Sequence, residues 1–355
     1  MKKATLQDIA AHASVSVSTV SRALSGAARV DPETRSRIRA AMEAVGYRAM
    51  KPSAEGAPSR TTGLLGFLMP EGMQSLGLNT SVYATVLGAG RTAAEAAGYA
   101  LTVGTYTNGP AVVTVGDRLL TQGDLEGAIL YRTRLADEGF ERFRDLKLPF
   151  IVINRLFDRD PVNCVGTDHQ RCGYLAAQHL LSLGHRRIAF LMGSRTIASF
   201  LGRLEGYHRA LAEAGVPSAK EWVIDCDLTP ASTRQAVQSM LQLPQPPTAL
   251  IAANDRTALV AMETAQQAGV SIPGDLSLVG FDDAEEAAYM SPALTTVRVE
   301  WAHMADLAAR MLVEVLQRRI VGRVYIALEP QLIVRQTTAP PGRESAAALP
   351  SQKGT

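Results

Sequence analysis

The stretch Ser14-Val15-Ser16-Val17-Ser18-Thr19-Val20-Ser21-Arg22-Ala23-Leu24 follows a short apolar-periodic segment, residues 6–13, at the spacing of two helices joined by a turn. Thr5 and Ser16 are suitable N-caps for these two helices. Small alanines at the expected crossing allow the two backbones to approach closely. The pattern predicts a helix-turn-helix, whose second helix enters a DNA major groove. The buried contacts are expected between Ile9, Ala10 and Ala13 on one helix and Val20, Ala23 and Leu24 on the other.

A third helix is predicted after this pair. Asp31-Pro32-Glu33 combines an N-cap, a proline at the first helical position and an acid in the first turn. An apolar stripe then ends at Gly46, a typical C-cap. The alternative is an ordinary pair of core helices, and Ser14 stands where many such turns carry glycine. The expected stripe consists of Ile38, Ala41, Met42 and Val45.

Positive charge is concentrated in this segment. Residues 1–50 contain eight lysines and arginines and four acids, a net charge of +4, while the whole chain carries +2. The remainder therefore carries −2, and the basic part is where phosphates would be met.

Composition places the rest of the chain among ordinary globular proteins. With 355 residues it is long enough for two or three domains, and no run of eighteen apolar residues predicts a membrane span. Lys2 and Lys3 are not followed by the apolar segment of a signal peptide. Three cysteines without metal-ligand spacing suit a reducing compartment, so a cytoplasmic location is expected, with no metal and no cofactor.

From residue 63 the pattern changes to alternating strands and helices, after a segment that is a linker by composition, Lys-Pro-Ser-Ala-Glu-Gly-Ala-Pro-Ser-Arg-Thr-Thr at 51–62. Two such series predict an α/β fold with two Rossmann-like subdomains and a cleft between them. Subdomain 1 is expected to comprise 63–163 and 297–324, and subdomain 2 to comprise 164–296 and 325–338. A disordered tail is expected at 339–355. The predicted strands are 63–69, 99–104, 127–131, 150–154, 187–192, 222–226, 249–252, 277–280, 294–298 and 325–328, and the predicted helices are 81–97, 115–122, 136–144, 170–184, 201–214, 231–241, 256–268 and 302–317.

Several ordered motifs of this chain resemble the lac repressor (LacI/GalR) family of transcriptional regulators over residues 4–338. The resemblance implies a homodimer on palindromic operator DNA and a periplasmic-binding-protein-like core that senses a small molecule, usually a sugar. The tail after Pro340 has one leucine, Leu349, so no tetramerising coiled coil is expected. The matching stretches are 16–26, Val45-Gly46-Tyr47, 183–189, Ala252-Ala253-Asn254-Asp255, Val279-Gly280-Phe281-Asp282-Asp283 and 292–297.

The helix-turn-helix supplies the candidate DNA contacts. We expect Arg22 to read a base edge, while Thr19 and Ser21 are better placed for phosphates. The full candidate set is Thr5, Ser16, Val17, Ser18, Thr19, Ser21, Arg22, Ser25, Tyr47 and Arg48.

The linker departs from the family. Its relatives carry a helix ending in a leucine that wedges into the minor groove. Here Pro52 disfavours helix at Lys51, Gly56 stands where that leucine is expected, and Met50 lies too early to replace it. A poorly formed hinge helix is therefore predicted.

Ligands of open α/β sheets bind beyond the carboxyl ends of strands, and polar residues gather there in this chain. An arginine, acids and amides make a good set for binding hydroxyl groups. The resemblance makes Arg203 and Asp282 the main effector contacts, with Leu228 and Ser199 at two further positions. Ile197 replaces an arginine of the purine-responsive member, which disfavours a purine. The candidate effector-binding residues are Tyr83, Asn154, Arg155, Ser199, Arg203, Leu228, Asn254, Asp255 and Asp282.

Other motifs are weaker. Gly88-Ala89-Gly90-Arg91-Thr92-Ala93 matches a dinucleotide fingerprint, but it lies inside a helical pattern and suits close helix packing. His169 and His185 are interpreted as helix-end or turn residues. The prediction is a regulator, more specifically a repressor; the alternatives are a small-molecule-binding module without DNA function and a nicotinamide-dependent enzyme.

Overall fold

The computed structural model describes residues 6–17, 19–20, 31–44, 62–71, 80–106, 119–120, 122–131, 143–155 and 162–342. The chain divides into two compact units, Met1–Arg60 and Thr61–Thr355. The first unit comprises the expected head, residues 1–50, and residues 51–60 of the expected linker.

The head is built around helices α1 (Leu6–Ala13) and α3 (Pro32–Ala44). The predicted turn follows α1: Ser14 adopts a left-handed conformation with φ 52°, and the N–H of Val15 donates to the carbonyl of Ala10 at 3.0 Å. Ser16 caps the next helical segment, because its Oγ accepts from the N–H of Thr19 at 3.2 Å. The head core consists of Ile9, Ala10, Ala13, Val20, Ile38 and Ala41, with Val15 and Met42 packed against it.

The third helix begins as predicted. The carboxylate of Asp31 accepts from the N–H of Thr34 at 2.8 Å, and Arg37 Nη2 donates to the carbonyl of Ala13 at 2.6 Å. The second contact ties α3 to the end of α1. The expected contacts of Ala23, Leu24 and Val45 lie outside the described residues.

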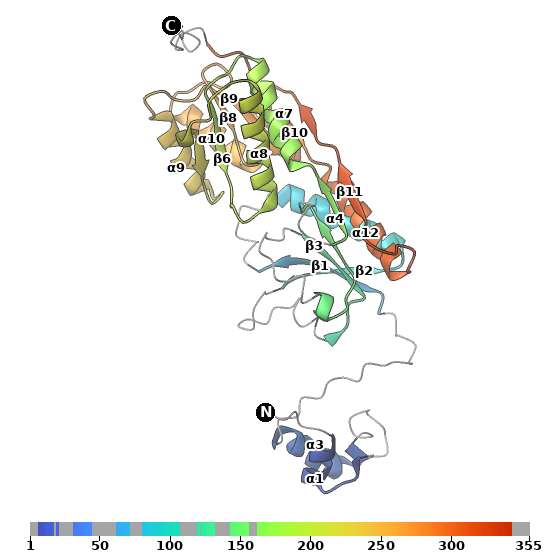
Figure 1. Ribbon diagram of the computed structural model, residues 1–355. Helices are drawn as coiled ribbons and strands as arrows, with labels where there is room; N and C mark the ends of the chain where they lie inside the picture. The colour runs from blue at the N-terminus through green and yellow to red at the C-terminus, as the bar shows by residue number, and fades with distance from the viewer. Residues whose placement is uncertain are drawn as a thin grey trace, which may run out of the picture. The chain divides into compact units, whose positions relative to one another are not determined.

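The core contains two six-stranded sheets, each mostly parallel, as the alternating pattern predicts (Figure 1). The first sheet has the order β11-β5-β4-β3-β1-β2, and α4 (Thr80–Ala96) and α12 (Trp301–Leu316) pack together against it. Its strands are β1 (Leu64–Pro70), β2 (Ala100–Tyr106), β3 (Gly127–Tyr131), β4 (Phe150–Ile153), β5 (Cys164–Thr167) and β11 (Tyr325–Leu328).

The second sheet has the order β12-β10-β9-β8-β6-β7, in which only the pairing of β12 with β10 is antiparallel. Helices α7 and α8 run side by side on one face, and α9 and α10 lie on the other (Figure 1). Its strands are β6 (Ile188–Met192), β7 (Val223–Asp225), β8 (Ala249–Ile251), β9 (Ser277–Asp282), β10 (Thr295–Arg298) and β12 (Gln331–Ile333); its helices are α7 (His169–Ser182), α8 (Ala198–Glu213), η2 (Lys220–Trp222), α9 (Pro230–Leu241), α10 (Asp255–Gln267) and α11 (Glu285–Tyr289).

The chain crosses between the two sheets three times, and the last strands complete both sheets as expected. The boundaries between the two subdomains differ from the predicted ones. β5 pairs with both β4 and β11, which places 164–167 and 325–328 in the first subdomain instead of the second. β10 belongs wholly to the second sheet, so that crossing follows Arg298 and not residue 296. The short β5 leads directly into α7, and only its pairing shows where it belongs.

Close packing fixes α7 against α8. A Cβ at Gly173 would collide with the backbone carbonyl of Arg203, and one at Gly206 would collide with that of Gln170. These positions bring α8, which carries Arg203, into backbone contact with the start of α7.

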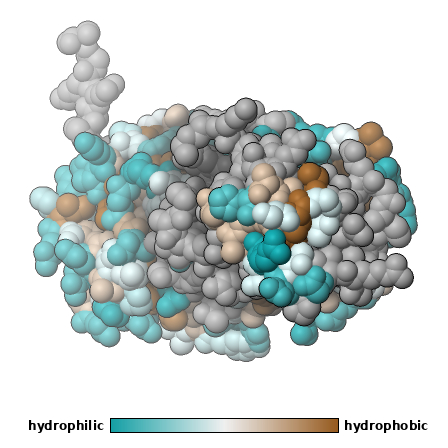
Figure 2. Space-filling view, turned by 90° about the horizontal axis from the view of Figure 1, so that it is seen from below, coloured by the Kyte–Doolittle hydropathy of each residue, from teal (hydrophilic) through white to brown (hydrophobic). Residues whose placement is uncertain are grey.

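The disordered tail was expected to begin at residue 339, which is too early in the sequence. His185 Nε2 lies 2.9 Å from the carbonyl of Ala339, whose N–H donates to Ser277 Oγ at 3.0 Å. Hydrogen bonds therefore hold Ala339, one residue past 338, and the described chain continues to Gly342. On the face in Figure 2, hydrophilic side chains predominate among the coloured residues, with hydrophobic ones between them. None of the helices in the described ranges has the length and apolar character needed to cross a membrane.

Candidate functional site

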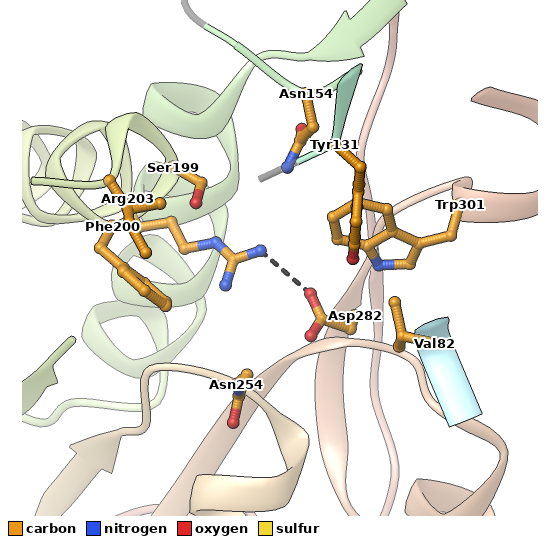
Figure 3. Close-up of a pocket in the computed structure, with 10 residues that line it drawn as sticks. Val82, Tyr131, Asn154, Ser199, Phe200, Arg203, Asn254, Asp282 and Trp301 are labelled. Atoms are coloured by element: carbon orange, nitrogen blue, oxygen red, sulfur yellow. Dashed lines mark hydrogen bonds and ion pairs between the residues drawn. The ribbon is translucent and has the colours of Figure 1, made fainter. Parts of the chain in front are cut away.

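The two subdomains of the core enclose a cleft at the carboxyl ends of their strands. The cavity between them has a volume of about 50 Å³. Polar groups lie opposite an aromatic wall (Figure 3). The lining residues are Val82, Tyr131, Asn154, Ile197, Ser199, Phe200, Arg203, Asn254, Asp282 and Trp301.

A buried ion pair lies at the centre of the cleft. Arg203 Nη2 donates to Asp282 Oδ1 at 3.0 Å, and both side chains are less than a tenth exposed. Nη1 donates to the carbonyl of Ala253 at 2.7 Å, and the guanidinium lies over the ring of Phe281 at 4.4 Å. The arginine is thereby held rigidly, which suits orientation of a polar ligand.

Asn154 enters the cleft from the end of β4. It adopts a positive φ of 62°, and its Oδ1 lies 2.6 Å from Nε2 of His169, the first residue of α7. Because an amide oxygen only accepts, His169 Nε2 donates. Burial, followed by the nearby Arg203 charge, holds the pKa of His169 well below its ordinary value, so the imidazole is neutral.

Asn254 and Asp255 begin α10 and have different roles. Asn254 is the N-cap: its Oδ1 accepts from the N–H and the Oγ1 of Thr257 at 2.9 and 2.8 Å. Asp255 is buried beneath the cleft, where it accepts from Thr296 Oγ1 at 2.6 Å and from the N–H of Ala284 at 2.8 Å. Burial, followed by the charge of Asp282, raises the pKa of Asp255 well above its ordinary value.

Aromatic residues form the facing wall. Tyr131 and Trp301 meet edge to face with ring centroids 6.1 Å apart. Phe67 and Tyr83 pack behind Tyr131, at 5.7 and 6.3 Å. Such rings offer an apolar surface against which a sugar ring can lie.

The structure brings together five of the nine predicted effector residues and places four elsewhere. Tyr83 packs behind the wall, and Asp255 is structural. Arg155 is buried beside Cys164 Sγ, which donates to its carbonyl. Leu228 lines a neighbouring hollow that shares Ile197 and Phe200 with the cleft. The residues that line the cleft as predicted are Asn154, Ser199, Arg203, Asn254 and Asp282.

Sequence reasoning missed Tyr131, Trp301, Phe200, Val82 and the contact of His169. Tyr131 ends a buried strand and was included in that core pattern, whereas Trp301 begins α12 one residue before the predicted helix 302–317 and was assigned to no element. The available signal was position: each lies at an end of its element that faces the cleft.

Three candidate DNA contacts lie within the described residues. Val17 is 41% exposed, and Ser16 Oγ lies 2.8 Å from Thr19 Oγ1 at the start of the second helical segment. The remaining candidates, Thr5, Ser18, Ser21, Arg22, Ser25, Tyr47 and Arg48, lie outside the described residues.

The other motifs show no chemistry of their own in the described part of the chain. Gly88 and Gly90 lie within α4, as predicted, and a Cβ at Gly90 would contact Ala305 of α12 at 3.9 Å. Cys164, Cys172 and Cys226 are buried and free. Among the residues whose placement is described, no cluster of His, Cys, Asp and Glu could hold a metal ion.

Comparison with known proteins gives the family. Residues 5–49 match the model of "Bacterial regulatory proteins, lacI family", and residues 177–338 match that of the periplasmic binding protein-like domain. The "Uncharacterized HTH-type transcriptional regulator in aml 5'region" of Streptomyces limosus is 32% identical over 342 residues, covering 94% of each chain.

Solved structures agree with this assignment. The transcriptional regulator CelR in complex with cellobiose has a TM-score of 0.71 and 27% identity, covering 94% of this chain and 100% of the other. The lac repressor dimer bound to operator and the anti-inducer ONPF has a TM-score of 0.66 and 26% identity, covering 95% and 100%. The chain belongs to the lacI family and is a DNA-binding transcriptional regulator.

Proposed function

We propose that this regulator is a repressor whose binding to operator DNA is controlled by a sugar or sugar derivative in the cleft. The observation that carries the proposal is the buried Arg203–Asp282 pair opposite Tyr131 and Trp301. A charged pair orients hydroxyl groups, and aromatic faces cover the apolar face of a sugar ring. The cellobiose bound by the CelR relative supports the same ligand class.

Each lining residue receives a role in this proposal. Arg203, Asp282 and Asn254 bind the polar groups of the effector from the second subdomain, together with Ser199. Asn154 and the aromatic wall bind it from the first subdomain. Leu228, Tyr83, Arg155 and Asp255 support the site from outside the lining. Because both subdomains contribute, effector binding changes the angle between them.

The DNA side of the proposal requires two heads. A palindromic operator offers two half-sites one helical turn apart, roughly 34 Å, and a homodimer matches that symmetry. The lac repressor relative is a dimer on its operator. Chromosomal DNA lies in the bacterial cytoplasm, so the proposal places the protein there and gives it no catalytic role.

A gel-shift assay on genomic fragments, with and without a sugar panel that includes cellobiose, tests the proposal. The expected result is a specific shift that one sugar changes. Failure to shift any fragment would favour a small-molecule-binding module without DNA function. Absorbance from a bound nicotinamide would favour the enzyme.

Asp282→Asn tests the location of the effector site. It keeps the shape of the side chain, and it should abolish the effector response while DNA binding remains. Asp225→Asn is the control, because Asp225 pairs with Arg195 at an exposed position outside the cleft. A normal response from Asp282→Asn would show that the cleft is not the effector site.

A further inference from the structure

The cleft asparagines both offer hydrogen-bond donors. In Asn154 the oxygen is engaged by His169, so the amide nitrogen Nδ2 is the group that points into the cleft (Figure 3). In Asn254 the oxygen caps α10 and points away from the pocket, which again leaves Nδ2 for a ligand. Neither amide nitrogen has a hydrogen-bond partner among the described residues.

Two further donors in the cleft are buried and unpartnered. Nε of Arg203 and Nε1 of Trp301 have no acceptor in the described structure, although both residues are at least nine-tenths buried. The indole nitrogen faces the pocket on the side of Val82 and Asp282 (Figure 3). Buried donors without acceptors are rare and unfavourable, so these two indicate a ligand that supplies acceptors.

Acceptors that bring no proton of their own are fewer, because the described side chains of Ser199 and Tyr131 offer only hydroxyl oxygens. Asp282 is the one carboxylate among the described lining residues, and it already accepts from Arg203. A hydroxyl group that accepts from these donors brings its own proton, which needs an acceptor in turn. A carbonyl or carboxylate oxygen accepts from two donors and brings no proton.

We infer that the effector carries a carbonyl oxygen, in a carboxylate or an ester, that accepts from the free donors of the cleft, with Asn154 Nδ2 and Trp301 Nε1 as the candidate donors. This inference rests on the proposed sugar-binding function and narrows it to sugar acids and their esters or lactones. His169 is a positioning residue: its neutral Nε2–H fixes the oxygen of Asn154 and thereby turns the amide nitrogen to the ligand.

Matched ligands test the inference in the full-length protein. Two sets are compared: galactose, galacturonate and galacturonate methyl ester, and the corresponding glucose compounds. Binding is measured by the rise in melting temperature and by calorimetry, since a ligand of the native state stabilises it. At least one acid or ester should bind tenfold or more tightly than its parent sugar. Preference for the acid over the ester identifies a carboxylate, and equal binding identifies an uncharged carbonyl.

Asn154→Asp replaces the donor by an acceptor of the same shape. The tight-binding acid or ester should lose tenfold or more in affinity, while the parent sugar changes less. Asn163→Asp is the matched control, because Asn163 Oδ1 accepts from the N–H of Val324 at 2.8 Å, outside the cleft. His169→Gln should reduce the ratio of acid to parent affinity, which a purely structural role would leave unchanged.

The outcomes separate this inference from the proposed function. A parent sugar that binds as tightly as its acid and ester, or more tightly, overturns the inference and leaves a sugar-responsive repressor. Absence of binding by every compound in both sets overturns the inference and also counts against a sugar effector. An unchanged ratio in Asn154→Asp shows that the carbonyl oxygen does not bind at Asn154.

Discussion

Asp282 and Asp283 are consecutive residues in the left-handed region, with φ of 109° and 52°, and their carboxylates bind different arginines. Asp282 pairs with Arg203 in the cleft, while Asp283 accepts from Arg298 at 2.8 Å and from Arg335 at 2.6 Å. Strained backbone of this kind persists where surrounding contacts hold it, and it is common at ligand-binding positions. Arg298 and Arg335 therefore hold the turn that directs the carboxylate of Asp282 into the cleft.

Asp283→Ala should release this turn. Removing a nearly buried carboxylate from two arginines should lower the free energy of unfolding by about 1–3 kcal/mol. Effector affinity should fall as well, because Asp282 loses its fixed direction. Urea denaturation and a crystal structure of the variant provide the measurements; φ of Asp282 near 109° in that structure would contradict the role. Asp306→Ala, in an exposed pair with Arg310, should cost much less.

His169 predicts a pH dependence of stability. Its pKa in the folded protein lies well below the unfolded value, because burial and the Arg203 charge disfavour the imidazolium. The unfolded chain therefore binds more protons below about pH 6.5. The contribution of this histidine is complete above that pH and decreases as the pH falls, by up to about 1.4 kcal/mol per pH unit. Denaturation of His169→Gln between pH 7 and 5 should show a shallower slope than the wild type.

Ser14→Gly should stabilise the head. The left-handed conformation of Ser14 is strained for a residue with a Cβ, whereas glycine adopts it readily. The larger backbone freedom of glycine in the unfolded chain opposes the gain, so the net effect should be at most about 1 kcal/mol. Slower hydrogen exchange of the α1 amides in the full chain is the expected observation. Ser14→Ala keeps the Cβ and should give no such protection.

Arg22→Ala tests how the head docks on DNA. A bidentate arginine–guanine contact contributes about 1–3 kcal/mol of discrimination against other bases. The variant should bind its operator more weakly and lose preference at one position in each half-site. Selection of binding sites from a random pool measures this directly, and an unchanged preference would show that another residue reads that base.

Much of the fold follows from pattern. The strands 127–131 and 325–328 have the predicted bounds: the first is a fully buried apolar run, and in the second exposed residues alternate with half-buried ones. β5 was missed: four residues that include Gly166 carry no clear pattern, and their place is set by pairing with β4 and β11. Because β5 and β11 are far apart in the sequence, local pattern does not reveal their pairing. The predicted subdomain boundaries were wrong for the same reason.

The candidate site was predictable for its charged and amide residues and not for its aromatic ones. Arg203, Asp282 and Asn254 lie at the ends of elements where topology concentrates ligands. Trp301 has the appearance of a core residue until the chain's second crossing brings it to the cleft. The hydrogen bond of His169 joins residues fifteen positions apart through the first crossing, so local sequence does not reveal it.

The hinge provides the last prediction, for residues that lie outside the described ranges. Pro52 disfavours a helical backbone at Lys51, and Gly56 replaces the leucine that the family inserts into the minor groove. A leucine inserted between two base pairs unstacks them and thereby kinks the DNA. The unstacking cost of a few kcal/mol per step is offset by a larger protein–DNA interface. Without the wedge, this regulator should bend its operator weakly and depend on phosphate contacts, which makes affinity fall steeply with salt. Circular permutation gels measure the bend. A sharp central kink that disappears when residues 49–56 are replaced would show that this hinge intercalates like that of its relatives.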